Sequence, residues 1–118
     1  MDIRYGLGSK RGTNDYLNSL PKINTIDQIN RKRDMKKIHV VGKFDRKGTV
    51  MSSSTRYGDT HKVTGFLVDD TGEIKVRLWG DIANTIENND ILELTEAYSK
   101  NGILNNKQGG KEKIHDLQ

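Results

Sequence analysis

The sequence predicts a small all-β domain, a barrel of five short strands, and three observations lead to this prediction. From residue 36 onward, apolar runs of strand length are separated by turn sequences such as Asn101-Gly102. Glu73–Trp79 alternates strictly between polar and apolar residues, which is typical of a strand with one buried face. Gly42 interrupts the first strand, and a glycine inside a strand often marks the sharp bend that closing a small barrel requires.

The elements are expected in a simple order along residues 23–114. Thr25 is a good N-cap for a short helical turn directly after it. The strands are predicted at Lys37–Phe44 with a continuation near Thr49–Met51, at His61–Asp69, Glu73–Trp79, Ile91–Tyr98 and Ile103–Lys107. The other segments are predicted to be a polar loop at Ser52–Asp59, a short helix at Ile82–Glu87 capped by Asp81, and a remainder with Gly109-Gly110 that is frayed at its end.

Composition limits how much of the chain can build a core. The hydrophobic fraction of 32% is low against the usual share of about 45–50%, so one small domain with some chain left over is expected. Residues 1–34 carry seven Lys/Arg against four Asp/Glu, which accounts for +3 of the net charge of +4. Residues 1–22 therefore predict a flexible basic tail, either a leader or an arm on a nucleic-acid backbone, and residues 115–118 a short C-terminal end.

The chain has no cysteine, which excludes disulfides and thiol chemistry and fits a reducing compartment. No apolar run approaches the length of a membrane span, and the first residues lack the pattern of a signal peptide. We therefore expect an intracellular protein of the cytoplasm or nucleoid, or of the nucleus in a eukaryote, with no membrane partner.

Trp79, the only tryptophan, shares one strand face with two cations. In the alternating stretch, Ile74 and the apolar residues that follow it point to the core, whereas Lys75, Arg77 and Trp79 point to the other face. Core formation does not require this arrangement. A surface that stacks bases and holds phosphates does require it, so the stretch indicates a nucleic-acid contact.

A five-strand order with one short helix between the third and fourth strands matches the OB-fold, a small Greek-key barrel. Three segments resemble the archaeal and eukaryotic single-stranded DNA-binding proteins, the simple relatives of replication protein A. These segments are Val40-Val41-Gly42-Lys43, Asp69–Gly80 and Asn89–Leu94. The resemblance covers about residues 36–114.

The resemblance implies that bases stack on aromatics at the ends of the third and fourth strands, which here are Trp79 and Tyr98. Tyr98 also continues the alternation of Leu92 and Leu94, so packing in the core stays open as an alternative. Relatives often carry a further aromatic before the fifth strand, where this chain has only Ser99–Gly102. This departure implies a smaller footprint or weaker binding, unless Tyr57 in the first loop compensates.

The predicted function is sequence-tolerant binding of single-stranded DNA in replication, recombination or repair, with replication or repair proteins as further partners. Stacking would come from the two rings, and phosphate contacts from Lys75 and Arg77. Looser candidates for phosphate contacts are Lys43, Arg56, Lys62, Lys100 and Lys107. Phe44 and Phe66 are expected in the core.

Catalysis is not expected. Asp70-Thr71-Gly72 is the tripeptide of aspartic proteases, but a single copy here fills a hairpin turn. The three histidines, His39, His61 and His115, lack ligand spacing, so no metal or cofactor is expected, and His39 and His61 are predicted on strand surfaces.

Two other binding functions remain open. One is an OB module for structured RNA, as in the anticodon-binding domains of some tRNA synthetases. The other is a protein-interaction subunit of a larger DNA-binding complex, in which Trp79 would be an interface anchor.

Overall fold

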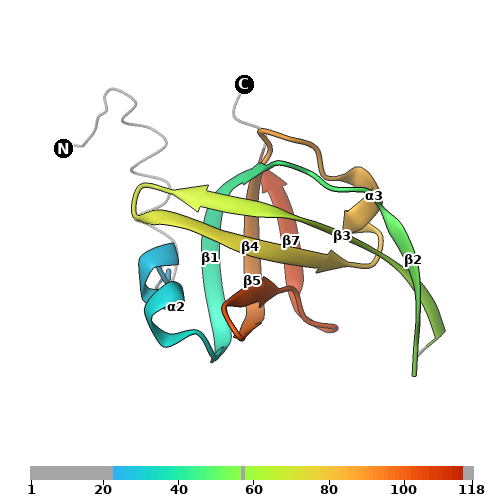
Figure 1. Cartoon of the computed structure of the whole chain (residues 1–118), viewed down its shortest axis with the longest axis horizontal. Coiled ribbons are helices and arrows are strands. Elements are labelled where there is room, and N and C mark those ends of the chain that lie inside the picture. The colour runs from blue at the N-terminus through green and yellow to red at the C-terminus, as the bar shows by residue number, and fades with distance from the viewer. Residues whose placement is uncertain (1–22, 57, 116–118) are drawn as a thin grey trace.

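The computed structural model describes residues 23–56 and 58–115, and Figure 1 shows them as a barrel from which one hairpin projects. The elements are α2 (Ile26–Lys32), β1 (Met35–Asp45), β2 (Met51–Thr55), β3 (Gly58–Asp69), β4 (Gly72–Trp79), α3 (Ile82–Thr85), β5 (Ile91–Lys100), β6 (Ile103–Asn105) and β7 (Lys111–His115). The predicted tail at 1–22, Tyr57 and residues 116–118 lie outside the described residues.

Five of the strands close the barrel in the order β1–β3–β4–β6–β5, and β5 pairs back onto β1. β4 and β6 run parallel, whereas β5 runs antiparallel to both β1 and β6. With α3 between the third and fourth strands of this barrel, the predicted fold class is confirmed. Most strands lie within a few residues of their predicted bounds.

The core fills the barrel and is covered at both ends. Ile74, Val76 and Leu78 of β4 point inward, as the alternation predicts, and are almost completely buried. Ile26 and Ile29 of α2 join the core beside β1, β3 and β4, and Ala83 and Ile86 join it from α3 and its end. The two helices lie at opposite ends of the barrel in Figure 1.

Helix α2 begins with the capping box that Thr25 makes possible. The Oγ1 of Thr25 accepts from the backbone N–H of Gln28 at 3.1 Å, and Oε1 of Gln28 accepts from the N–H of Thr25 at 3.0 Å. These bonds satisfy two N–H groups that have no partner inside the helix. The predicted N-cap is confirmed, and the helix runs for seven residues rather than one turn.

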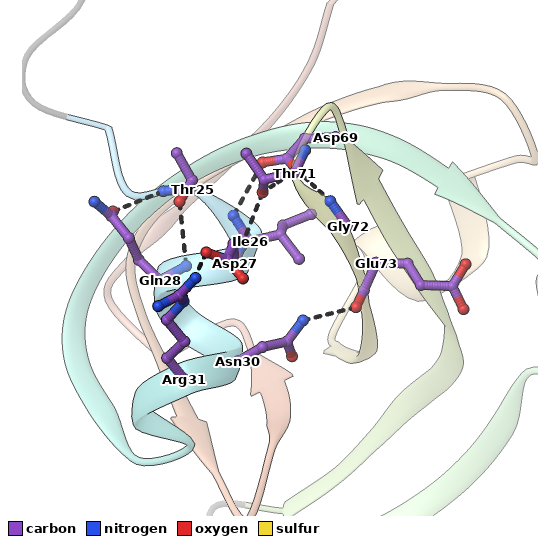
Figure 2. A network of polar contacts seen from close by, with 10 residues as sticks. All are labelled: Thr25, Ile26, Asp27, Gln28, Asn30, Arg31, Asp69, Thr71, Gly72 and Glu73. Carbon is purple, nitrogen blue, oxygen red and sulfur yellow. Dashed lines mark hydrogen bonds and ion pairs between the residues drawn. The ribbon is translucent and has the colours of Figure 1, made fainter.

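Figure 2 shows how the β3–β4 turn docks this helix. The backbone N–H of Ile26 donates to Oδ2 of Asp69 at 3.0 Å, and that of Asp27 to Oγ1 of Thr71 at 2.9 Å. The side-chain amide of Asn30 donates to the carbonyl of Glu73 at 2.9 Å. Side chains of the turn thus act as additional caps, and the tripeptide that includes Thr71 has a structural use here.

Strand β2 is the largest departure from the predicted elements. The continuation of the first strand near Thr49–Met51 and the polar loop at Ser52–Asp59 are both wrong, because Met51–Thr55 pairs with residues 58–62 of β3. Most side chains of this hairpin are exposed on both faces, so the strand has no apolar alternation to detect. The hydroxyls of Ser54 and Thr55 tie its tip, at 2.9 Å to Asp59 Oδ1 and 2.8 Å to the Gly58 carbonyl.

The end of the chain also departs from expectation. The fifth barrel strand stops at Asn105 rather than Lys107, and the remainder of the chain, where no strand is predicted, contains β7, which pairs with Ile91–Thr95 of β5. Most side chains of β7 are exposed, so its sequence lacks the apolar alternation that predicts a strand.

The predicted helix at Ile82–Glu87 is shorter than expected, and Asp81 takes the predicted N-cap position without capping the helix through its side chain. Asp81 has helical dihedrals, and its side chain makes no capping hydrogen bond. Ile86 already has an extended backbone and is fully buried, so the chain leaves the helix to place this side chain in the core. Among the described residues, no helix is long and apolar enough to cross a membrane.

Candidate nucleic-acid interface

The outer surface of β3, β4, β6 and β5 forms one continuous face, which we call the platform. In the β3–β4 ladder Trp79 lies opposite Lys62, and in the β4–β6 ladder Arg77 lies beside Asn105. Asn105 in turn lies opposite Tyr98 of β5. Because directly paired residues point to the same side of a sheet, the ladders bring both predicted rings and Arg77 onto one face.

A second row of the platform runs parallel to the first. Lys75 of β4 lies between Phe66 of β3 and Ile103 of β6, and Ile103 lies opposite Lys100 of β5. Lys75 and Lys100 are exposed. Three of the four strands therefore contribute a cation from the predicted set to this face.

Trp79 is partly buried and is held by two consecutive asparagines. Its indole Nε1–H donates to Oδ1 of Asn105 at 3.1 Å. Its backbone N–H donates to Oδ1 of Asn106 at 2.8 Å, and its carbonyl accepts from Nδ2 of Asn106 at 2.9 Å. Both asparagines are buried, at 3% and 7% exposure. The amide of Asn106 thus continues the β4–β6 ladder by one step and fixes the end of β4.

These asparagines are functional candidates that the sequence did not reveal. Asn106 also donates to Oε2 of Glu112 in β7 at 3.1 Å. The same asparagine therefore links the end of β4 to β7. The ammonium of Lys62 lies 5.3 Å from the centre of the Trp79 ring, within the range of a cation–π contact. In the sequence, only the two consecutive asparagines at the end of a short apolar run point to this role, and such a pair is a weak signal.

A β-bulge decides the orientation of Tyr98. Val40 of β1 pairs with Leu94, and Ile38 pairs with Ala97, so two steps along β1 correspond to three steps along β5. The extra residue is Glu96, which is exposed and has a φ of 56°. Such an inserted residue shifts the side-chain alternation of its strand by one position.

The shift places Tyr98 on the outer face. Before Glu96 the buried positions include Leu92 and Leu94, and after it they are Ala97 and Ser99. Tyr98 is partly buried and stands opposite Asn105 on the platform. Tyr98 therefore does not pack inside the barrel, which was the alternative that strict alternation allowed.

The other predicted cations are spread more widely. Lys107 is exposed and follows Asn106 directly, so it lies at the edge of the platform beside Trp79. Lys43 is exposed on β1, one strand beyond β3. Arg56 is exposed in the turn of the β2–β3 hairpin, away from the paired rows. The structure therefore gathers most of the predicted residues and leaves Lys43 and Arg56 apart.

The prediction for Phe66 is wrong, whereas Phe44 is fully buried as expected. Phe66 is partly buried on the outer side of β3, because its neighbours Gly65 and Leu67 take the inward positions. A Cβ at Gly65 would lie 2.5 Å from Cζ of Phe44, so the ring of Phe44 already occupies the space over this glycine. The guanidinium of Arg46 lies 4.0 Å from the centre of the Phe66 ring.

A polar cluster lies away from the platform on β1, β5 and β7. Nε2 of His39 lies 2.5 Å from Oε2 of Glu93, and Nε2 of His115 lies 2.8 Å from Oε1. His39, predicted on a strand surface, is thus mostly covered, because its ring pairs with a buried carboxylate. Burial alone would raise the pKa of the Glu93 carboxyl, but the hydrogen bonds from the two imidazoles outweigh burial and lower this pKa. Within the described residues, no group of three His, Cys, Asp or Glu is placed to hold a metal ion.

A polar hollow lies between the hairpin and the start of α3. It is lined by Ser52, Ser53, Ser54, Asp59, Thr60, His61 and Asp81. Its lining includes two carboxylates, no Lys or Arg, and the imidazole of His61 as its one ring, so it suits a phosphate backbone less well than the platform does. The platform is the better candidate for a nucleic-acid contact.

The comparisons with solved structures agree with the barrel described above: the protein has the OB-fold. The OB domain of Ta0387 from Thermoplasma acidophilum superposes with a TM-score of 0.62 at 15% identity, over 81% of this chain and 89% of that chain. A replication protein A heterotrimer bound to single-stranded DNA gives a TM-score of 0.62 at 17% identity, over 86% of this chain and 27% of that chain. No protein-family model and no curated protein matches the sequence.

Proposed function

We propose that this protein is a binding module, not an enzyme, that takes up single-stranded DNA without strong sequence preference. The proposal rests mainly on one observation: two aromatic rings, Trp79 and Tyr98, share the outer face of the barrel with Arg77. The similarity to a replication protein A heterotrimer bound to single-stranded DNA supports it. The predicted role in replication, recombination or repair belongs to the same proposal.

The geometry suits an extended strand better than a duplex. Trp79 and Tyr98 are separated by two strand spacings and by two residues along the ladders, which corresponds to about 12 Å between Cα atoms. At this spacing the two rings would stack on different bases of one strand. Stacking on an aromatic contributes about 1–3 kcal/mol per base and depends little on base identity.

Phosphates would lie along the cations between and beside the rings. Arg77 stands in the row of Tyr98, and Lys75 and Lys100 stand in the next row. Contacts of this kind position the strand, make binding sensitive to salt and carry no sequence information. Weak sequence preference follows from the combination of stacking and phosphate contacts.

Titration with oligo-dT, followed by tryptophan fluorescence at low salt, tests the proposal. Trp79 is the only tryptophan, so quenching reports directly on its ring. We expect saturable quenching that weakens as salt is added. A protein that neither binds oligo-dT nor shows quenching would contradict the proposal.

Two competitors separate the alternatives. A folded RNA that displaces oligo-dT efficiently would favour the RNA-binding function. Failure of every nucleic acid to bind, together with capture of a tight protein partner that covers Trp79, would favour the interaction subunit.

A further inference from the structure

Phe66 and Arg46 form a stacked pair on the platform that none of the predicted contacts uses. Phe66 lies opposite Lys75 of β4 on one side and Asp45 of β1 on the other. It stands four residues along the ladder from the Lys62–Trp79 pair, which corresponds to about 13 Å. The pair therefore extends the platform beyond the two rings already described.

The guanidinium of Arg46 is held over the ring by two carboxylates. Nη2 of Arg46 donates to Oε1 of Glu73 at 2.7 Å, and Nε of Arg46 lies 3.6 Å from Oδ2 of Asp45. The backbone of Arg46 has a φ of 52° and donates its N–H to Oδ1 of Asp45 at 2.8 Å, so the turn itself aims this side chain. The hydrogen bond to Glu73 is the main cause of a raised pKa of Arg46.

Arg46 and Glu73 are both partly open to solvent. The side chains of Arg46 and Glu73 are 48% and 52% exposed, so a ligand can reach both without rearrangement of the barrel. A guanidinium plane accepts a stacked base as an aromatic ring does. Its N–H groups bind phosphate with the same fork geometry that they use for a carboxylate.

We propose that Arg46, supported by Phe66, is a third base-stacking site, and that the Glu73 carboxylate occupies its phosphate position until nucleic acid displaces it. This inference rests on the proposed function and adds to it a contact for which Glu73 and the nucleic acid compete. The base stacks on the guanidinium face turned away from Phe66, and a backbone phosphate replaces Oε1 of Glu73. Glu73 acts as an internal competitor, so it sets the affinity for strands long enough to reach this site.

The other use of such a pair is purely structural. Arg46 then only covers an exposed ring, and the ion pair with Glu73 is one of many surface pairs that contribute little. The two cases differ in how affinity depends on the length of the DNA, because only the third site requires a longer strand.

The test measures the affinity of oligo-dT graded from about 4 to about 16 nucleotides, the range of OB-fold site sizes. The variants are Phe66→Leu, which keeps an apolar cover, Arg46→Lys, which keeps the charge but loses the plane, and Glu73→Gln. Glu87→Gln, an exposed carboxylate beyond α3, controls for net charge. Tryptophan quenching is recorded in every titration.

We expect Phe66→Leu and Arg46→Lys to lower affinity about tenfold for the long oligonucleotides and to leave the shortest unchanged. Glu73→Gln should raise affinity for the long oligonucleotides several-fold more than Glu87→Gln does. Wild-type affinity of Phe66→Leu and Arg46→Lys at every length, with normal quenching, would overturn the third site alone. Loss of quenching and binding in the unmodified protein would instead overturn the proposed function and this inference together.

Discussion

The indole N–H of Trp79 on β4 donates a hydrogen bond of 3.1 Å to Oδ1 of Asn105 on β6. Asn105 is buried, and its own amide donates to the carbonyl of Ile103 at 3.2 Å, which fixes the orientation of the acceptor. The ring is therefore set in one position before any ligand arrives. A stacking surface that is already ordered loses less conformational entropy when a base binds.

Replacement of Asn105 by leucine tests this positioning role. Leucine has nearly the same side-chain volume as asparagine, but it offers no acceptor to the indole N–H of Trp79. We therefore expect the binding of oligo-dT to weaken by about 1 kcal/mol, roughly fivefold. The readouts are affinity, the tryptophan emission maximum and fluorescence anisotropy of the free protein. Gln108→Leu in the exposed loop nearby is the matched control. If emission and anisotropy stay unchanged in Asn105→Leu, the hydrogen bond does not order the ring.

Tyr98 is predicted to stack through its ring and not through its hydroxyl. Tyr98→Leu should therefore weaken binding by about 1–3 kcal/mol, whereas Tyr98→Phe should bind nearly as well as the unmodified protein. Fluorescence titration at fixed salt measures both. Equal loss in the two variants would mean that the hydroxyl, and not the stacked ring, makes the contact.

The bulge at Glu96 is predicted to be necessary for the barrel. Glycine adopts a positive φ without strain, so Glu96→Gly should keep or slightly raise the free energy of unfolding. Thr95→Gly, at a neighbouring position with no positive φ, should lose about 1 kcal/mol. Deletion of Glu96 should be far more damaging, because it keeps Ala97 inward and Tyr98 outward but removes the bend and added twist that the bulge gives to β5. Urea unfolding of the three variants provides the comparison, and a stable deletion variant would contradict the role of the bulge.

These elements show where the sequence predicts the structure well. The alternation of Glu73–Trp79 and the turn at Asn101-Gly102 depend on local chemistry, and both are observed. The turn has a positive φ at both residues, as a tight hairpin requires. The capping function of Thr25 is local in the same way. Such features can be predicted because neighbouring residues in the chain determine them.

The features that were missed depend on pairing between distant strands. The bulge at Glu96 exists only because β5 must follow β1 around the barrel, and β2 is a strand only because β3 extends beyond the barrel to meet it. Phe66 faces outward because Phe44, from another strand, fills the space over Gly65. No local pattern contains this information.

Salt dependence distinguishes the phosphate contacts on the platform from charge elsewhere. Arg77→Gln should reduce the slope of log affinity against log salt by about 0.7, the value for one phosphate on a single strand. Lys113→Gln, exposed on β7 and opposite Glu93, is the control and should leave the slope unchanged. Titrations at several salt concentrations measure the slope. Equal slopes for Arg77→Gln and the unmodified protein would exclude a phosphate contact at this position.

Stability is predicted to depend on pH through Glu93. Because the pKa of its carboxyl is lower in the folded protein than in the unfolded chain, the folded state binds fewer protons at acidic pH. The stabilisation is therefore complete above the ordinary pKa of glutamate and is lost as the pH falls through the lower folded value. Each Nε2 of His39 and His115 must carry a proton to donate, since an ionised carboxylate only accepts.

Glu93→Gln should remove this dependence. Urea unfolding should show a less stable variant at neutral pH, and the difference from the unmodified protein should shrink as the pH falls from about 5 to about 3. Glu87→Gln serves as the control at an exposed carboxylate and should follow the unmodified protein throughout. A constant difference between Glu93→Gln and the unmodified protein across this range would show that the carboxylate stabilises the fold by packing alone. The charge of the Glu93 carboxylate would then have no share in joining β7 to β1 and β5.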